Sequence, residues 1–132
     1  MMVTRVNPPG LAAPSGFSHA VVAEGSRVVF LAGQTGMDPT GAIVAGGLVA
    51  QFEQALANLL AALAAAGGRP EHLGSLTVYI VDMDDYRARA RELGEVWRRL
   101  VGHDYPAMAG VGVSRLWDAE ALVEVQGAAV LP

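Results

Sequence analysis

Glu124 is the residue whose type and position most strongly suggest chemistry. It lies inside the apolar run 122–130, between Val123 and Val125. A carboxylate in such a strand is costly to bury unless it is paired, hydrogen-bonded or in contact with water. Two interpretations are therefore open. Either Glu124 faces solvent on an alternating strand, or it faces a pocket in which it holds a ligand or a water molecule.

The other polar residues lack the spacing of a metal site or of a nucleophilic triad. His19, His72 and His103 lie in different segments, whereas zinc requires three or four converging ligands. The glycine-rich segment 33–36 lacks the lysine of a phosphate-binding loop, and no serine lies in a nucleophile-elbow motif. We therefore expect no metal site.

Composition argues against several function classes. The chain has 132 residues, which suits one domain spanning residues 1–132. The net charge is −4 and lysine is absent, which disfavours binding to nucleic acids and anionic membranes. Without cysteine, the chain can form neither a disulfide framework nor a thiolate nucleophile. Residues 1–9 lack the apolar core of a signal peptide, and the apolar run 55–66 is too short to span a membrane. We therefore expect a soluble cytoplasmic protein.

Runs of apolar and β-branched residues predict strands at 3–6, 20–23, 28–31 and 73–81. The polar residues 24–27 between the second and third runs predict a hairpin. The runs 105–113 and 121–125 predict another hairpin, with its turn at 114–119. A short strand at 42–44 is also expected.

Two amphipathic segments predict helices. The first begins near Val49 and ends at Gly67-Gly68, with large apolar residues on one face. The second is capped by Asp82 and continues to the arginine pair 98–99. Its buried seam is expected to contain Tyr86, Ala90, Leu93, Trp97 and Leu100.

This order of elements predicts an α+β domain with one mostly antiparallel sheet and two helices packed on one face. The other face of the sheet is then rich in valine, alanine and glycine. Apolar residues make up 52% of the chain and charged residues 17%. Such a surface predicts self-association, because another subunit would cover the apolar face.

Four segments share their order and spacing with a known family. They are Leu31-Ala32-Gly33-Gln34-Thr35; Gln54-Ala55-Leu56-Ala57-Asn58-Leu59 with its Ala-Gly-Gly stop; the strand-into-helix phrase 78–86; and Pro106-Ala107 followed by Leu122-Val123-Glu124-Val125. Together they resemble the Rid family (RidA/YjgF), which contains imine and enamine deaminases. The resemblance spans nearly the whole chain. It implies a fold resembling chorismate mutase, a homotrimer, and a ligand cleft at each subunit interface.

The resemblance also implies roles for individual residues. Glu124 matches the family glutamate that positions the water attacking the C=N carbon, and Gly33 matches the loop glycine. Phe17 matches the aromatic residue at the cleft mouth, which is usually tyrosine. Met108 occupies the position of the arginine that binds the substrate carboxylate, and Gly110 stands where many members have cysteine. The implied reaction needs no cofactor, because an imine is already electrophilic.

Met108 is uncharged, which argues against ordinary 2-imino-acid deamination, since losing a buried charged partner costs about 2–5 kcal/mol of binding. Arg115, on the turn after the strand that contains Met108, is a further candidate for the cleft.

The leading hypothesis is a Rid-like trimer that binds small imine, enamine or carbonyl compounds. Phe17, Met108 and Glu124 would line its cleft, and imine hydrolysis is the reaction such a site could perform. The alternative is a non-catalytic metabolite-sensing or partner-binding trimer. RNA cleavage, attributed to some relatives, is disfavoured by the acidic charge.

Overall fold

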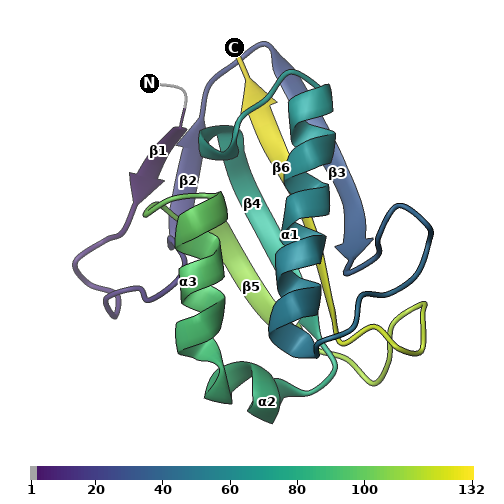
Figure 1. Cartoon of the computed structure of the whole chain (residues 1–132). Coiled ribbons are helices and arrows are strands. Elements are labelled where there is room, and N and C mark those ends of the chain that lie inside the picture. Colours follow the sequence, from purple (N-terminus) through teal and green to yellow (C-terminus); the bar gives the residue numbers. More distant parts are fainter. Residues whose placement is uncertain (1–2) are drawn as a thin grey trace.

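The computed structural model describes residues 3–132 (Figure 1). Residues 1 and 2, part of the N-terminal stretch considered above, lie outside the described residues. The elements in chain order are β1 (Val3–Val6), β2 (Ala20–Ala23), β3 (Arg27–Thr35), α1 (Leu48–Ala65), the 3-10 helix η1 (Pro70–His72), β4 (Leu73–Ile80), α2 (Met83–Ala88), α3 (Ala90–Leu100), β5 (Ala107–Gly112) and β6 (Val123–Leu131).

Four strands form the main sheet in the order β3-β6-β4-β5, while β1 and β2 form a separate two-stranded sheet. Neighbouring strands of the main sheet are antiparallel except β4 and β5, which are parallel. The segment containing α2 and α3 supplies the crossover that a parallel pair requires. Helices α1 and α3 lie on the same face of the sheet (Figure 1). The predicted α+β fold, with a mostly antiparallel sheet covered by helices on one face, is confirmed.

The hydrophobic core lies between the main sheet and α1. Leu56, Leu59 and Leu63 project from α1 into this layer and are fully buried. On the sheet side, alternate residues of β4 are buried, as its sequence pattern predicts. We call this side of the main sheet the helix face, and the opposite side the open face.

Helix α1 is longer than the apolar run recognised in the sequence. Its 18 residues have a mean hydropathy of 1.4, so by length and composition it could cross a membrane. The run 55–66 covers only the later part of this helix, so its length alone does not describe the whole apolar segment. The apolar side of α1 packs on the sheet, which explains why a core helix has this composition. The helix ends as predicted at Gly67, whose φ of 91° favours glycine.

Both predicted hairpins are wrong, although the strands themselves are present. β2 pairs with β1, and β3 pairs with β6. The residues between β2 and β3 contact the end of β6, where the Ser26 N–H donates to the Leu131 carbonyl at 3.0 Å. β4 lies between β5 and β6, so residues 113–122 form a loop that passes the end of β4. Residues 42–44 contribute only an isolated bridge, between Met37 and Ile43.

The predicted second helix is divided at Arg89 into α2 and α3. Its predicted cap is confirmed, because the Asp82 carboxylate accepts a hydrogen bond from the Asp85 N–H at 3.0 Å. Trp97 is buried as expected. Ala90 is exposed instead, because the backbone turn at Arg89 separates it from the register of the preceding helix.

Candidate functional site

The residues predicted to form the site lie on opposite faces of the main sheet. Val123 and Val125 of β6 are fully buried on the helix face, so Glu124 between them points to the open face. Met108 pairs with Leu76 in the β4–β5 ladder and therefore lies on the helix face. Within one chain, Met108 and Glu124 do not share a cleft.

Gly33 and Glu124 are brought together on the open face. β3 carries a bulge at this point. A Cβ atom on Gly33 would overlap Oε2 of Glu124 and lie 2.9 Å from its Cδ. Only glycine leaves this space free, so the bulge and the glycine together make room for the carboxylate.

The surroundings of Glu124 are polar. Its cross-strand neighbours are Thr35 on β3 and Tyr79 on β4. The Tyr79 hydroxyl donates to Oε1 of Gln126 at 2.9 Å. Glu124 is half-buried, and within residues 3–132 its carboxylate forms neither an ion pair nor a hydrogen bond. Its lone pairs are therefore free to hold water or to take up a proton.

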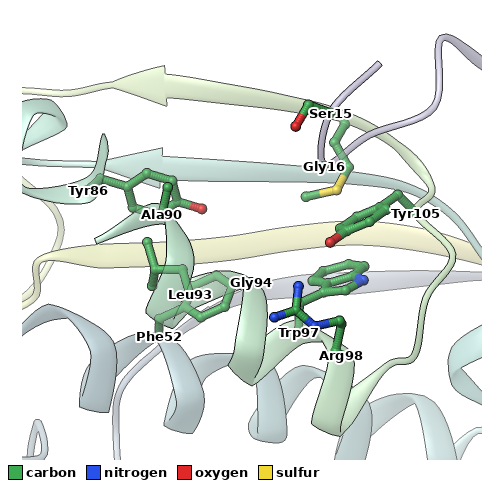
Figure 2. A pocket seen from close by; sticks show the side chains of 11 residues that line it. Ser15, Gly16, Phe52, Tyr86, Ala90, Leu93, Gly94, Trp97, Arg98 and Tyr105 are labelled. Carbon is green, nitrogen blue, oxygen red and sulfur yellow. The ribbon is translucent and has the colours of Figure 1, made fainter. Parts of the chain in front are cut away.

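A cavity of about 340 Å³ lies on the helix face, between the helices and the edge strand β5 (Figure 2). We call it the aromatic pocket. The Trp97 and Tyr105 rings stack there with centroids 5.1 Å apart, and Phe52 meets Tyr86 edge-on at 6.3 Å. Burial raises the pKa of Tyr86, which keeps its hydroxyl protonated. The pocket is lined by Ser15, Gly16, Phe52, Tyr86, Ala90, Leu93, Gly94, Trp97, Arg98, Tyr105 and Met108.

Gly110 lies on the helix face of β5, two residues beyond Met108, but it does not line the aromatic pocket. A Cβ atom on Gly110 would lie 3.6 Å from Cδ1 of Ile80, which is ordinary contact. A larger residue than glycine would therefore fit at this position. Nothing in the packing of β5 requires a glycine here.

Phe17 and Arg115 belong to neither group. The Phe17 ring meets His19 edge-on, with centroids 5.1 Å apart. The residue after Phe17 bridges to the start of β5, so the segment lies beside that strand. The Arg115 guanidinium bends back onto its own loop, where it donates to the carbonyls of Leu116 and Trp117 at 3.2 and 3.5 Å.

Arg98 is the residue of this region that the sequence interpretation missed. The sequence places it only in the arginine pair 98–99 near the helix end, where it is expected to be solvated; it is exposed as expected, and it also lines the aromatic pocket. The signal that could have revealed it is Gly94, because residues four apart lie on the same helix face. No group of three or more acidic or histidine side chains suited to a metal ion occurs within the described chain.

Comparisons with known proteins agree with the fold. The family model described as Endoribonuclease L-PSP matches residues 9–131. A RutC family protein of Pyrococcus horikoshii is 37% identical over 114 residues, covering 86% of this chain and 85% of that protein. The human 2-iminobutanoate/2-iminopropanoate deaminase is 30% identical over 116 residues, covering 87% of this chain and 79% of the human protein. The crystal structure of YyfB from Yersinia pestis, a Rid family protein of unknown function, has a TM-score of 0.88 and 33% identity, covering 99% of this chain and 100% of that one. The chain therefore belongs to the Rid family, as its four sequence segments predicted.

Proposed function

We propose that this Rid-family chain binds small imine, enamine or carbonyl metabolites and hydrolyses those that carry a C=N bond. The observation that carries the proposal is the half-buried Glu124 carboxylate, which lies over Gly33 without a protein partner within residues 3–132. Relatives named 2-iminobutanoate/2-iminopropanoate deaminase support imines as the substrate class.

The reaction needs one acid–base residue, and we assign this role to Glu124. Water adds to the imine carbon, a C–O bond forms, and the π electrons of the C=N bond pass to nitrogen. Glu124 accepts a proton from the attacking water and returns it to the nitrogen. The carbinolamine hydroxyl then gives its proton to the amino nitrogen, by way of Glu124, the C–N bond breaks, and ammonia leaves as the C=O bond forms. Because the imine is already electrophilic, this sequence can proceed without a cofactor.

We further propose that the chain is a cytoplasmic homotrimer whose clefts lie between subunits. Phe30 and Val28 are large apolar residues of β3 and remain 84% and 58% exposed in the single chain. Another copy would cover this surface, as expected for exposed apolar patches. A cleft between copies could also unite Glu124 of one subunit with Met108 of its neighbour. Light scattering that gives the mass of a monomer would contradict this part of the proposal.

Met108 determines which imines we expect to react. Its thioether cannot form the charge-assisted hydrogen bonds that a guanidinium makes with a carboxylate. We therefore expect the wild type to act slowly on 2-iminopropanoate and faster on imines without a carboxylate. Met108→Arg should raise the rate with 2-iminopropanoate, whereas Met108→Leu, the matched control, should not.

The test is to generate both kinds of imine in situ and to follow ammonia release with each variant. Circular dichroism must first establish that each variant is folded, because Met108 is partly buried. Hydrolysis of uncharged imines by the wild type would support the proposal. A wild type that binds metabolites but hydrolyses no imine would favour the alternative function, a metabolite-sensing trimer.

A further inference from the structure

We propose that the aromatic pocket binds small carboxylic acids that carry an aromatic ring, and that Arg98 binds their carboxylate. This inference goes beyond the proposed function and can be tested separately, because the aromatic pocket lies on the helix face and Glu124 lies on the open face. It assigns the anion-binding group to a helix residue rather than to position 108 on β5.

The charge distribution of the pocket favours an anion. Arg98 is the only charged residue among those that line it. Within residues 3–132, its guanidinium forms no ion pair. Three nearby arginines differ in this respect: Arg89, Arg91 and Arg99 each pair with a carboxylate. A guanidinium without a protein carboxylate is free to bind one from a ligand in a bidentate manner.

Gly94 makes room for this guanidinium. Nη1 of Arg98 lies only 3.3 Å from the place that a Cβ atom on Gly94 would occupy. Arg98 extends from α3 beside Gly94 and toward the pocket (Figure 2). A glycine inside a helix costs about 1 kcal/mol relative to alanine. The charged end of Arg98 lies beside the space that results.

The rest of the pocket suits an aromatic ring. Four aromatic side chains line it, and offset or edge-on contacts with them would favour another ring. The Tyr86 and Tyr105 hydroxyls point toward the interior of the pocket (Figure 2). Within residues 3–132 neither hydroxyl forms a hydrogen bond, so both can donate to a ligand. The cavity volume of about 340 Å³ is within the range of small-molecule sites. A two-carbon acid would leave the aromatic wall uncovered.

Phenylacetate is a suitable probe, with phenylacetamide as its uncharged isostere and acetate as the acid without a ring. Binding can be followed through the fluorescence of Trp97, which lines the pocket. The other tryptophan, Trp117, is 93% exposed, and Trp117→Phe removes its signal. In this background we compare Arg98→Gln with Arg91→Gln, a control on the same helix whose side chain is 92% exposed.

We expect phenylacetate to bind at least about tenfold more tightly than phenylacetamide or acetate, since hydrogen bonds to charged groups are the stronger ones. Arg98→Gln should remove this preference without changing phenylacetamide binding, and Arg91→Gln should change neither. Gly94→Ala should weaken phenylacetate binding as well, because the new methyl group crowds Nη1. The inference would be overturned if phenylacetate bound with the same affinity in the wild type and in Arg98→Gln. It would also be overturned if phenylacetate did not bind at millimolar concentration. If phenylacetate does not bind but the same protein hydrolyses uncharged imines, this inference fails and the proposed function stands. If phenylacetate binds through Arg98 but no imine is hydrolysed, this inference stands and the proposed function fails.

Discussion

Replacing Gln51 by leucine should lower the free energy of unfolding by about 2 kcal/mol. Gln51 is a buried residue of α1, 5% exposed, that holds the loop leading into Glu124. Its Oε1 accepts from the Leu122 N–H at 2.8 Å, and its Nε2 donates to the Glu120 carbonyl at 3.1 Å. Leucine keeps the bulk but leaves the Leu122 N–H without its acceptor, which costs about 1–3 kcal/mol. The Glu120 carbonyl belongs to an exposed residue and can bind water instead.

This loss converts into a measurable shift of the melting temperature. The entropy of unfolding is about 2.1 cal/mol/K per residue, so the 132 residues give about 0.28 kcal/mol/K. A loss of about 2 kcal/mol then lowers Tm by about 7 °C. The assay is thermal unfolding followed by circular dichroism, at equal protein concentration for all variants.

Gln54→Leu is the matched control on the same helix. Nε2 of Gln54 donates only to the side chain of Asn58, at 2.8 Å, so no backbone group loses its direct partner when Gln54 is replaced. We expect its Tm to fall by less than half as much as that of Gln51→Leu. Equal shifts in the two variants, or an unchanged Tm for Gln51→Leu, would refute the view that Gln51 fastens this loop.

Three further predictions concern pH, the site and a helix cap. Burial raises the pKa of Tyr86 above its ordinary value of 10.0, so its contribution to stability is complete below that pH and declines as the pH rises beyond it. In urea unfolding on either side of pH 10.0, the wild type should lose stability relative to Tyr86→Phe, and parallel curves would contradict this. Gly33→Ala should push the Glu124 carboxylate aside at a cost of about 0.5–1.5 kcal/mol and lower imine hydrolysis about a hundredfold. An unchanged rate in a folded variant would argue against this. Asp82→Ala removes the acceptor of the Asp85 N–H and should cost about 1 kcal/mol in urea unfolding. Asp84→Ala, which removes no cap bond, should cost less.

The sequence predicts best what depends on local periodicity. The apolar stripe of α1, its glycine stop and the alternation in β4 all follow from the spacing of neighbouring residues. Strand order depends on contacts between distant segments, which that spacing does not encode. The sequence therefore did not predict that β4 lies between β5 and β6. It also did not predict that the run at Ala20–Ala23 pairs with the preceding strand β1 instead of the following strand β3.

The site shows the same division between local pattern and three-dimensional placement. Glu124 could be recognised because a carboxylate is unusual in an apolar strand, and Gly33 because of its family motif. Their adjacency depends on the bulge in β3 and on the pairing of β3 with β6. The location of Met108 on the opposite face depends on its parallel pairing with β4. Arg98 resembles any solvated helix arginine until the fold places it at the aromatic pocket.

The most direct test of the proposed function compares imine hydrolysis by the wild type and by Glu124→Gln. Glutamine has nearly the size of glutamate but cannot accept a proton from water. Imines without a carboxylate are generated in situ, and ammonia release is followed with both proteins. Thermal unfolding must first show that the two proteins have the same Tm. Since general acid–base residues contribute about 10²–10⁴-fold, the wild type should accelerate release and Glu124→Gln should lose about a hundredfold or more of that acceleration. Equal rates with the two proteins, or a wild type without effect on any imine, would contradict the assignment of Glu124 as the acid–base residue of a working hydrolase.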